Sequence, residues 1–213
     1  MNKFKLIIFD WDGTLMDSTD LIASCVQKAF ADCHLPIPTI TQAKSIIGLA
    51  LAEAINVLYP KANQQLTNKL ALSYRKHFFS TQQTQEHLFP EVLSTLNQLK
   101  TNNIKLAVAT GKARIGLDKD LKATKLDSFF DATRAADETK SKPDPLMLKE
   151  ILQQLEIDAC DSLMVGDSEY DLKMANNCNM PSVAVSYGAH SVERLVQFKP
   201  LKIIDNIQGL LSF

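Results

Sequence analysis

The feature that most constrains this chain is an apolar run at residues 6–9, Leu-Ile-Ile-Phe, that ends directly in Asp-Trp-Asp-Gly-Thr (10–14). The run is typical of a short strand, and strand residues i and i+2 point to the same side. Asp10 and Asp12 are therefore expected side by side. Two such carboxylates repel each other unless a cation offsets their charge or one of them carries a proton. The segment indicates a metal-assisted reaction site, or chemistry in which one acid is protonated.

Apolar runs of the same kind recur along the chain, at residues 106–109, 163–165, 183–185 and 203–204. Most are apolar at every position, as expected for strands buried on both faces of a parallel sheet. Amphipathic or capped helical patterns lie between them, at 92–99, 145–155 and 169–177. This alternation predicts an α/β fold with a doubly wound, mostly parallel, Rossmann-like sheet.

Residues 18–88 differ from the rest because they contain no convincing strand pattern. They indicate consecutive helices, separated at prolines, at about 18–33, 41–58 and 63–80. The block follows directly on the acidic strand end, where open α/β sheets bind their ligands. We therefore expect a core of residues 1–17 and 89–213 with an inserted all-helical cap of residues 18–88. The alternative is that these helices simply cover one face of the sheet.

The composition excludes several classes of protein. The 213 residues are 46% hydrophobic and 22% charged, which is ordinary for a globular protein, and the net charge of −1 gives no reason to expect nucleic acid as a partner. No run of about 18 apolar residues exists, so no membrane span is expected, and the N-terminal apolar stretch is too short for a signal peptide. The four cysteines form no Cys-x-x-Cys pair, which favours reduced thiols in a cytoplasmic protein over a zinc site.

Further polar clusters follow the other predicted strands or precede a predicted helix. They are Thr-Gly-Lys (110–112), Ser-Lys-Pro-Asp-Pro (141–145) and Gly-Asp-Ser-Glu-Tyr-Asp (166–171). Because the carboxyl ends of parallel strands meet at one edge of a sheet, we expect these clusters to converge with Asp10 and Asp12.

Together these segments resemble the motifs of the haloacid dehalogenase superfamily, in its phosphatase branch, with phosphoglycolate phosphatase as a near relative. The matching motifs are Asp-Trp-Asp-Gly-Thr-Leu (10–15), Ala-Thr-Gly-Lys (109–112), Ser-Lys-Pro-Asp-Pro (141–145) and Gly-Asp-Ser-Glu-Tyr-Asp (166–171). The resemblance covers nearly the whole chain, and the block 18–88 matches the position of the family's four-helix cap. It implies phosphoryl transfer, in which charge must be stabilised on the equatorial phosphoryl oxygens.

By this resemblance Asp10 is the expected nucleophile, which forms an aspartyl-phosphate. Asp12 is the expected acid and base, which protonates the leaving alkoxide and then deprotonates water. The resemblance also implies a Mg²⁺ cofactor, which suits all-oxygen ligation, held by Asp10, by the backbone carbonyl of Asp12 and by Asp167.

Three more residues are expected to bind the phosphoryl group: Thr110 through its hydroxyl, Gly111 through close backbone approach and Lys142 through its charge. Asp171 is expected behind them, orienting Lys142 or a metal-bound water. The plainer alternatives are that Thr110 and Asp167 are ordinary helix caps, that Lys142 is an exposed loop lysine and that Asp171 is an exposed helix acid. Lys112 can steer anions or simply be exposed.

A few residues outside the motifs are also candidates. Gly48 can lie in a cap loop that touches substrate or at an ordinary helix junction, while His190 and Arg134 can line the pocket rim or serve packing. Trp11 points away from the two acids and is expected to pack. Glu91 departs from the family's pattern, in which glycine commonly follows the proline, and this bears on the junction between cap and core.

The chain is therefore expected to be a Mg²⁺-dependent phosphomonoester hydrolase of small phosphorylated metabolites, with phosphoglycolate as the leading single candidate. A sugar-phosphate mutase, a nucleotidase or a pyrophosphatase of the same fold are the enzyme alternatives, whereas Asp12 argues against a true dehalogenase. A phospho-receiver domain and a binding protein without activity are the alternatives from other classes. The protein is expected to be a monomer or homodimer.

Overall fold

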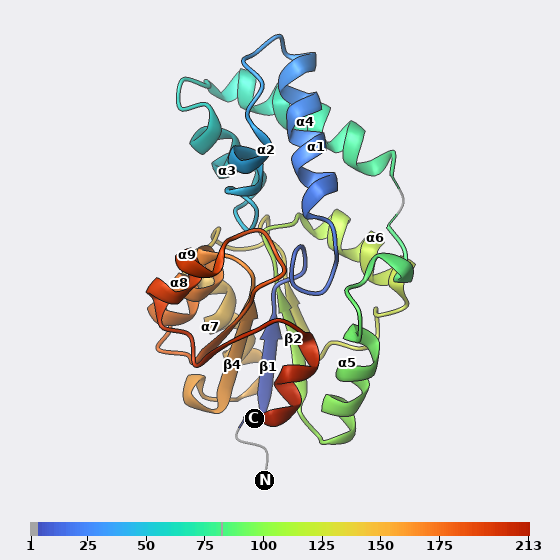
Figure 1. Ribbon diagram of the computed structural model, residues 1–213, viewed down its shortest axis with the longest axis vertical. Helices are drawn as coiled ribbons and strands as arrows, with labels where there is room; N and C mark the ends of the chain where they lie inside the picture. Colours follow the sequence, from blue (N-terminus) through green and yellow to red (C-terminus); the bar gives the residue numbers. More distant parts are fainter. Residues whose placement is uncertain (1–3, 82) are drawn as a thin grey trace.

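The computed structural model describes residues 4–81 and 83–213, and its centre is a six-stranded parallel sheet (Figure 1). Residues 1–3 of the expected core and residue 82 of the expected cap lie outside the described residues. The strand order is β3-β2-β1-β4-β5-β6. The strands are β1 (Leu6–Phe9), β2 (Lys105–Ala109), β3 (Ala132–Arg134), β4 (Ser162–Gly166), β5 (Ser182–Val185) and β6 (Lys202–Ile204).

The order places β1 at the middle of the sheet, paired with β2 on one side and with β4 on the other. The chain winds outward through β2 and β3, then returns to continue through β4, β5 and β6. The reversal of direction leaves a crevice at the carboxyl ends of the central strands, which is where open α/β sheets bind ligands. The expected doubly wound α/β fold is confirmed.

Strand β3 was not expected from the sequence. It is three residues long and forms one edge of the sheet, pairing only with β2. Thr133 and Arg134 are partly exposed, so the strand lacks the continuous apolar run that identified its neighbours. A short edge strand with polar residues carries little periodic signal.

Helices cover both faces of the sheet, as its alternating side chains require. Ile7 and Phe9 belong to a buried apolar cluster with residues of the helices at Val92–Thr101 and Arg114–Thr124. Leu6 and Ile8 pack on the other face, with residues of the helices at Leu146–Leu155 and Glu169–Asn177. The core helices are α5 (Val92–Thr101), α6 (Arg114–Thr124), α7 (Leu146–Leu155), α8 (Glu169–Asn177) and α9 (Val192–Leu195). Short 3₁₀ helices lie at Gln85–His87, Ala159–Asp161, Val196–Phe198 and Ile207–Ser212.

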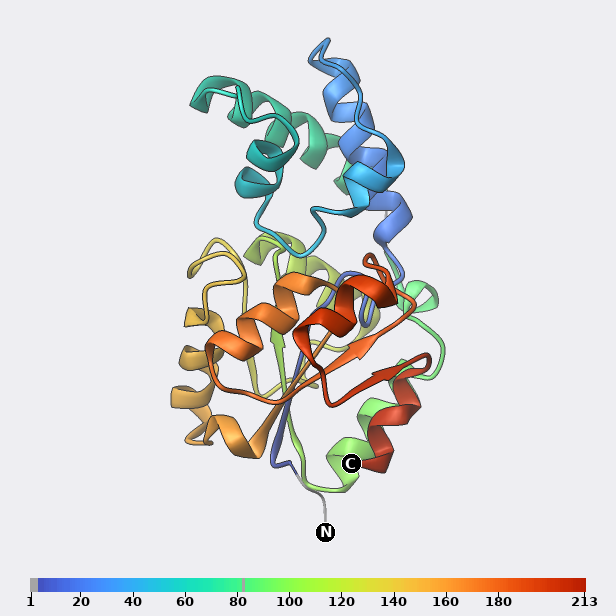
Figure 2. The same ribbon diagram turned by 60° about the vertical axis from the view of Figure 1, so that its left-hand side comes forward.

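A helical block lies between β1 and α5 and packs around an apolar cluster of its own. Its helices are α1 (Thr19–Asp32), α2 (Ile40–Lys44), α3 (Leu51–Leu58) and α4 (Gln64–Phe79). The expected single helix at 41–58 is wrong, because the chain turns between α2 and α3, where Gly48 has a φ of +104° that favours glycine. Figures 1 and 2 show the block above the carboxyl ends of the strands. The division at residues 18 and 88 stays a prediction.

Among the described residues, no helix combines the length and the apolar character that a membrane crossing requires. The four cysteines are all free thiols, with Cys25 buried and Cys160 exposed.

Candidate active site

The clusters at 10–14, 110–112 and 141–145 converge on a cavity of about 730 Å³ between the sheet and the helical block, whereas Asp167 and Asp171 are buried outside its lining. Asp10, Asp12, Thr110, Gly111 and Lys142 all line it. These residues lie close together because of the strand register. Phe9 of β1 lies opposite Val108 of β2 and Val165 of β4, so the polar residues that follow these strands begin at nearly the same level of the sheet.

A buried ion cluster forms the floor of the site. The Lys142 ammonium lies 2.7 Å from Asp10 Oδ1 and 2.6 Å from Asp171 Oδ1, and these three side chains are at most 2% exposed. Burial raises the pKa of Asp10 well above its usual value, while Lys142 opposes that rise. Burial lowers the pKa of Lys142, but the two carboxylates outweigh it, so the amine stays cationic. Asp171 therefore contacts Lys142, the first of its two expected partners. Its role in catalysis stays a prediction.

Asp167 lies beside this cluster and is held by two donors. The Thr14 hydroxyl donates to Oδ1 at 3.0 Å, and the Ala189 N–H donates to Oδ2 at 2.7 Å. Gly13, with a φ of +85°, lies so close that a Cβ there would collide with the carboxylate. Burial, and secondly the negative charge of Asp171, raise the pKa of Asp167 to about 7.

The carboxylates suit a divalent cation. One oxygen from each of Asp10, Asp167 and Asp171 lies within 4.8 Å of the others, and all three residues are buried. Crowded carboxylates raise one another's pKa unless a cation neutralises them, and hard oxygen donors are the ligands that Mg²⁺ prefers. The expected set of Asp10, the Asp12 carbonyl and Asp167 shares two residues with this group.

Asp12 is held differently from Asp10. Its Oδ1 accepts a hydrogen bond from Ser18 Oγ at 2.7 Å and lies 3.2 Å from the Lys112 ammonium. Lys112 also lies 2.8 Å from Asp120, and its side chain is only 8% exposed. Burial lowers the pKa of Lys112, but Asp12 and Asp120 raise it overall. The alternative of an exposed Lys112 is therefore wrong.

Sequence reasoning missed Asp120. The available signal was its position on the buried face of helix α6, which also carries Leu117, Leu121 and Thr124. Aspartate is rarely buried without a partner, so an acid on that face indicates a cation nearby.

The motif at 110–112 touches the helical block directly. Thr110 is 1% exposed and its N–H donates to the Arg134 carbonyl at 3.0 Å. A Cβ at Gly111 would meet the backbone oxygens of Gly48 and Leu49, so only glycine allows this approach. Gly48 also lines the cavity, so it lies against the site.

Three further hydrogen bonds join the turn at residues 45–50 to the core. The Ser45 carbonyl accepts from Tyr170 Oη at 3.1 Å and lies 3.2 Å from His190 Nε2. The Ala50 N–H donates to Ser141 Oγ at 2.9 Å, next to Lys142. His190 is 3% exposed, which makes it a packing residue rather than part of the cavity lining.

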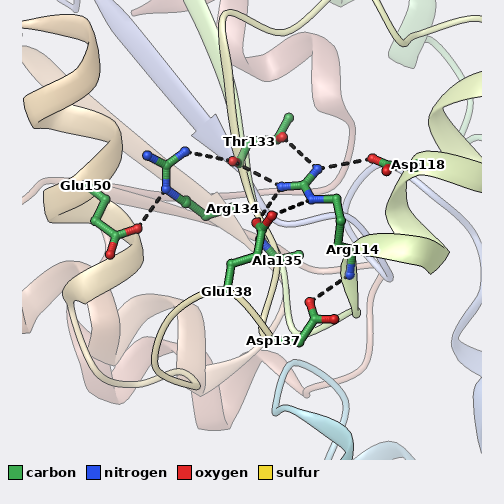
Figure 3. A network of polar contacts seen from close by, with 8 residues as sticks. All are labelled: Arg114, Asp118, Thr133, Arg134, Ala135, Asp137, Glu138 and Glu150. Carbon is green, nitrogen blue, oxygen red and sulfur yellow. Dashed lines mark hydrogen bonds and ion pairs between the residues drawn. The ribbon is translucent and has the colours of Figure 1, made fainter.

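A polar network supports the loop that leads to Lys142 (Figure 3). The Arg114 guanidinium donates to both oxygens of Glu138, at 2.8 and 2.6 Å, and Glu138 in turn accepts from the Ala135 N–H. Arg134 pairs with Glu150 at 2.7 Å and donates to the Thr133 carbonyl. The alternative that Arg134 lines the pocket rim is not supported, because Arg134 is absent from the cavity lining.

The family model described as haloacid dehalogenase-like hydrolase matches residues 7–185. The chain belongs to this family. It is also 33% identical over 213 residues to "Probable phosphatase IndB" of Dickeya dadantii (strain 3937), covering 97% of this chain and 92% of that protein. Pyrophosphatase PpaX of Bacillus thuringiensis (strain Al Hakam) is 28% identical over 210 residues, covering 98% and 95%.

Solved structures of two predicted phosphatases share the whole fold. A predicted phosphatase from Clostridium acetobutylicum superposes with a TM-score of 0.86 at 25% identity, covering 98% of this chain and 97% of that one. A predicted phosphoglycolate phosphatase from Haemophilus somnus 129pt gives a TM-score of 0.84 at 24% identity, covering 100% and 98%. The expectation of a phosphatase of this superfamily is confirmed.

Proposed function

We propose that the protein is a Mg²⁺-dependent phosphomonoester hydrolase that acts on small phosphorylated metabolites through an aspartyl-phosphate at Asp10. The observation that carries this proposal is the buried Asp10–Lys142–Asp171 cluster at the carboxyl end of β1, beside Asp167, with Asp10 and Lys142 lining the cavity. A buried carboxylate held in place by a cation suits attack on an anionic phosphoryl group.

Each residue of the site has a separate role in the proposed reaction. Asp10 attacks phosphorus, Lys142 and the Thr110 hydroxyl hold phosphoryl oxygens, and Asp12 gives a proton to the leaving oxygen. Asp12 next takes a proton from the water that hydrolyses the intermediate. Asp10, the Asp12 carbonyl and Asp167 would hold Mg²⁺, and Asp171 orients Lys142 or a metal-bound water. The bound cation would offset the negative charges of the nucleophile and the phosphate.

The substrate is proposed from the cavity and the relatives. Residues 18–88 act as a cap that closes one side of the cavity and recognises the leaving group. Phosphoglycolate remains the first candidate. Pyrophosphate is the second, because a relative matched over nearly its full length is named a pyrophosphatase. We further propose a cytoplasmic monomer or homodimer with reduced thiols, consistent with the four free cysteines.

The test is a metabolite screen with a metal control. Purified protein with Mg²⁺ is assayed against phosphoglycolate, pyrophosphate, sugar phosphates and nucleoside monophosphates, and kcat/KM is compared. EDTA is expected to remove activity and added Mg²⁺ to restore it, while Asp10→Asn is expected to abolish turnover and keep the fold. Turnover that survives chelation, or an active Asp10→Asn variant, contradicts the proposal.

A further inference from the structure

The pair Lys112–Asp120 is a buried ion pair that the proposed chemistry leaves unused. Asp120 comes from helix α6 and its side chain is 5% exposed, on a helix face that also buries Leu117 and Leu121. Burying two charges carries a large desolvation cost before their attraction is counted. Such a pair is a poor choice for stability alone, so its placement beside Asp12 needs another explanation.

The Lys112 ammonium is fixed from three directions. It lies 2.8 Å from Asp120 Oδ2, 3.2 Å from Asp12 Oδ1 and 4.3 Å from the ring centroid of Phe78 in α4. Gly116 provides the room for its stem, since a Cβ there would lie 3.0 Å from Lys112 Cγ. A lysine held in this way has little freedom to leave Asp12 for a substrate phosphate.

Both donors to Asp12 use the same oxygen. Ser18 Oγ and Lys112 Nζ contact Oδ1, and among the described residues no donor is seen on Oδ2. Oδ1 accepts a hydrogen bond from the Ser18 hydroxyl and lies against the Lys112 ammonium, so it is already engaged by two groups. Oδ2 is therefore the oxygen left available to a leaving group, and the side chain cannot rotate to exchange its two oxygens without breaking both contacts.

We propose that Lys112, anchored by Asp120, is a positioning residue that holds Asp12 with Oδ2 presented as the proton donor to the leaving oxygen. This inference rests on the proposed function. As the Asp10–phosphorus bond forms and the bond from phosphorus to the leaving oxygen breaks, the proton passes from Asp12 Oδ2 to that oxygen. A loosened Asp12 slows this step for an alkoxide, which needs the proton, but not for a leaving group that departs as a stable anion.

The test compares two esters of similar size, benzyl phosphate and p-nitrophenyl phosphate. Benzyl alcohol must leave with a proton, whereas p-nitrophenolate does not, and kcat/KM reports the steps up to enzyme phosphorylation. Lys112→Met keeps the stem and removes the charge. It is expected to lower kcat/KM for benzyl phosphate by about 100-fold and to leave the value for p-nitrophenyl phosphate within about threefold of wild type.

Matched variants separate positioning from other roles. Asp120→Asn is expected to show the same selective loss, and it stands in for Lys112→Met if that variant does not fold. Lys119→Met is the control: this lysine is also on α6 and lies over the neighbouring ring of Phe79 at 5.1 Å, but it contacts neither acid. It is expected to keep both activities.

Equal losses with both esters would overturn the inference, because they indicate general disruption or direct phosphate binding by Lys112. Unchanged rates with both esters in the Lys112 and Asp120 variants would overturn it too. Failure of the proposed function is distinct: the wild-type protein would then hydrolyse neither ester with Mg²⁺ present.

Discussion

At the scale of single residues, the two acids that end β1 are distinguished by their partners. Asp10 faces the Lys142 ammonium at 2.7 Å inside a fully buried cluster, whereas Asp12 accepts from Ser18 and lies beside Lys112 near the cavity wall. A buried, charge-paired carboxylate suits a nucleophile, and a carboxylate with one free oxygen suits proton transfer.

Replacing Asp12 tests that distinction. Asp12→Ala is expected to slow both formation and hydrolysis of the aspartyl-phosphate, each by about 10²- to 10⁴-fold with an alkyl phosphate, because both steps lose proton transfer. Rapid-quench measurement of phosphoenzyme formation and decay reads the two steps separately. Rates equal to wild type in both steps would remove the acid and base role from this residue.

The residues of the motifs were predictable because their spacing carries chemistry. Asp10, Thr110 and Lys142 all line the cavity, as expected from strand ends that meet at one edge. Asp120 and Ser18 were not predicted, since each acts through a long-range contact that no short motif records.

At the scale of elements, helix α5 begins at a strained position. Glu91 precedes the helix with a φ of +65°, in the left-handed region that favours glycine. Glu91 stands where relatives commonly have glycine, and glycine is the residue that adopts this conformation without cost. Its carboxylate is tied by Ser94 Oγ at 2.8 Å and Gln208 Nε2 at 3.1 Å.

Two variants separate strain from these contacts. Glu91→Ala removes the hydrogen bonds and keeps Cβ, while Glu91→Gly removes both. We expect the glycine variant to be about 1 kcal/mol more stable than the alanine variant. Denaturant unfolding of the pair measures the difference, and an alanine variant at least as stable as the glycine variant would show that the backbone is not strained there.

The ion pair that supports the loop before Lys142 is expected to make the stability of the protein depend on pH. The hydrogen bond from Arg114 lowers the pKa of Glu138, so the folded state holds that proton less tightly than the unfolded state. The resulting stabilisation is present above the unfolded pKa of about 4.3 and is lost as pH falls through the lower folded pKa. Glu138→Gln is expected to be less stable than wild type at pH 7, by less than about 1 kcal/mol because the pair is partly exposed.

Unfolding free energies of wild type and Glu138→Gln at pH 7 and pH 3.5 check this. The gap between the two proteins is expected to narrow at the lower pH. A gap of constant size across that range would mean that the charge of Glu138 does not support the loop.

At the scale of the whole molecule, the doubly wound parallel sheet and the helical block after β1 were predictable from the alternation of apolar strands and helices, but the order of the strands was not predicted. The exceptions have physical causes. Strand β3 is a short polar edge strand, and the helix expected at 41–58 is broken at a turn stabilised by core contacts with Tyr170 and His190. Contacts between distant segments fix such turns, and local sequence patterns do not report them.

The central claim is that Asp10 carries the phosphoryl group, and trapping that intermediate tests it most directly. Wild-type protein with Mg²⁺ and its best substrate is quenched during turnover, reduced with borohydride and digested for peptide mass spectrometry. Reduction converts an aspartyl-phosphate to homoserine, so homoserine is expected at position 10 and only when substrate is present. Turnover with no homoserine at position 10, or with homoserine at position 12 instead, would contradict the assignment of Asp10 as the nucleophile.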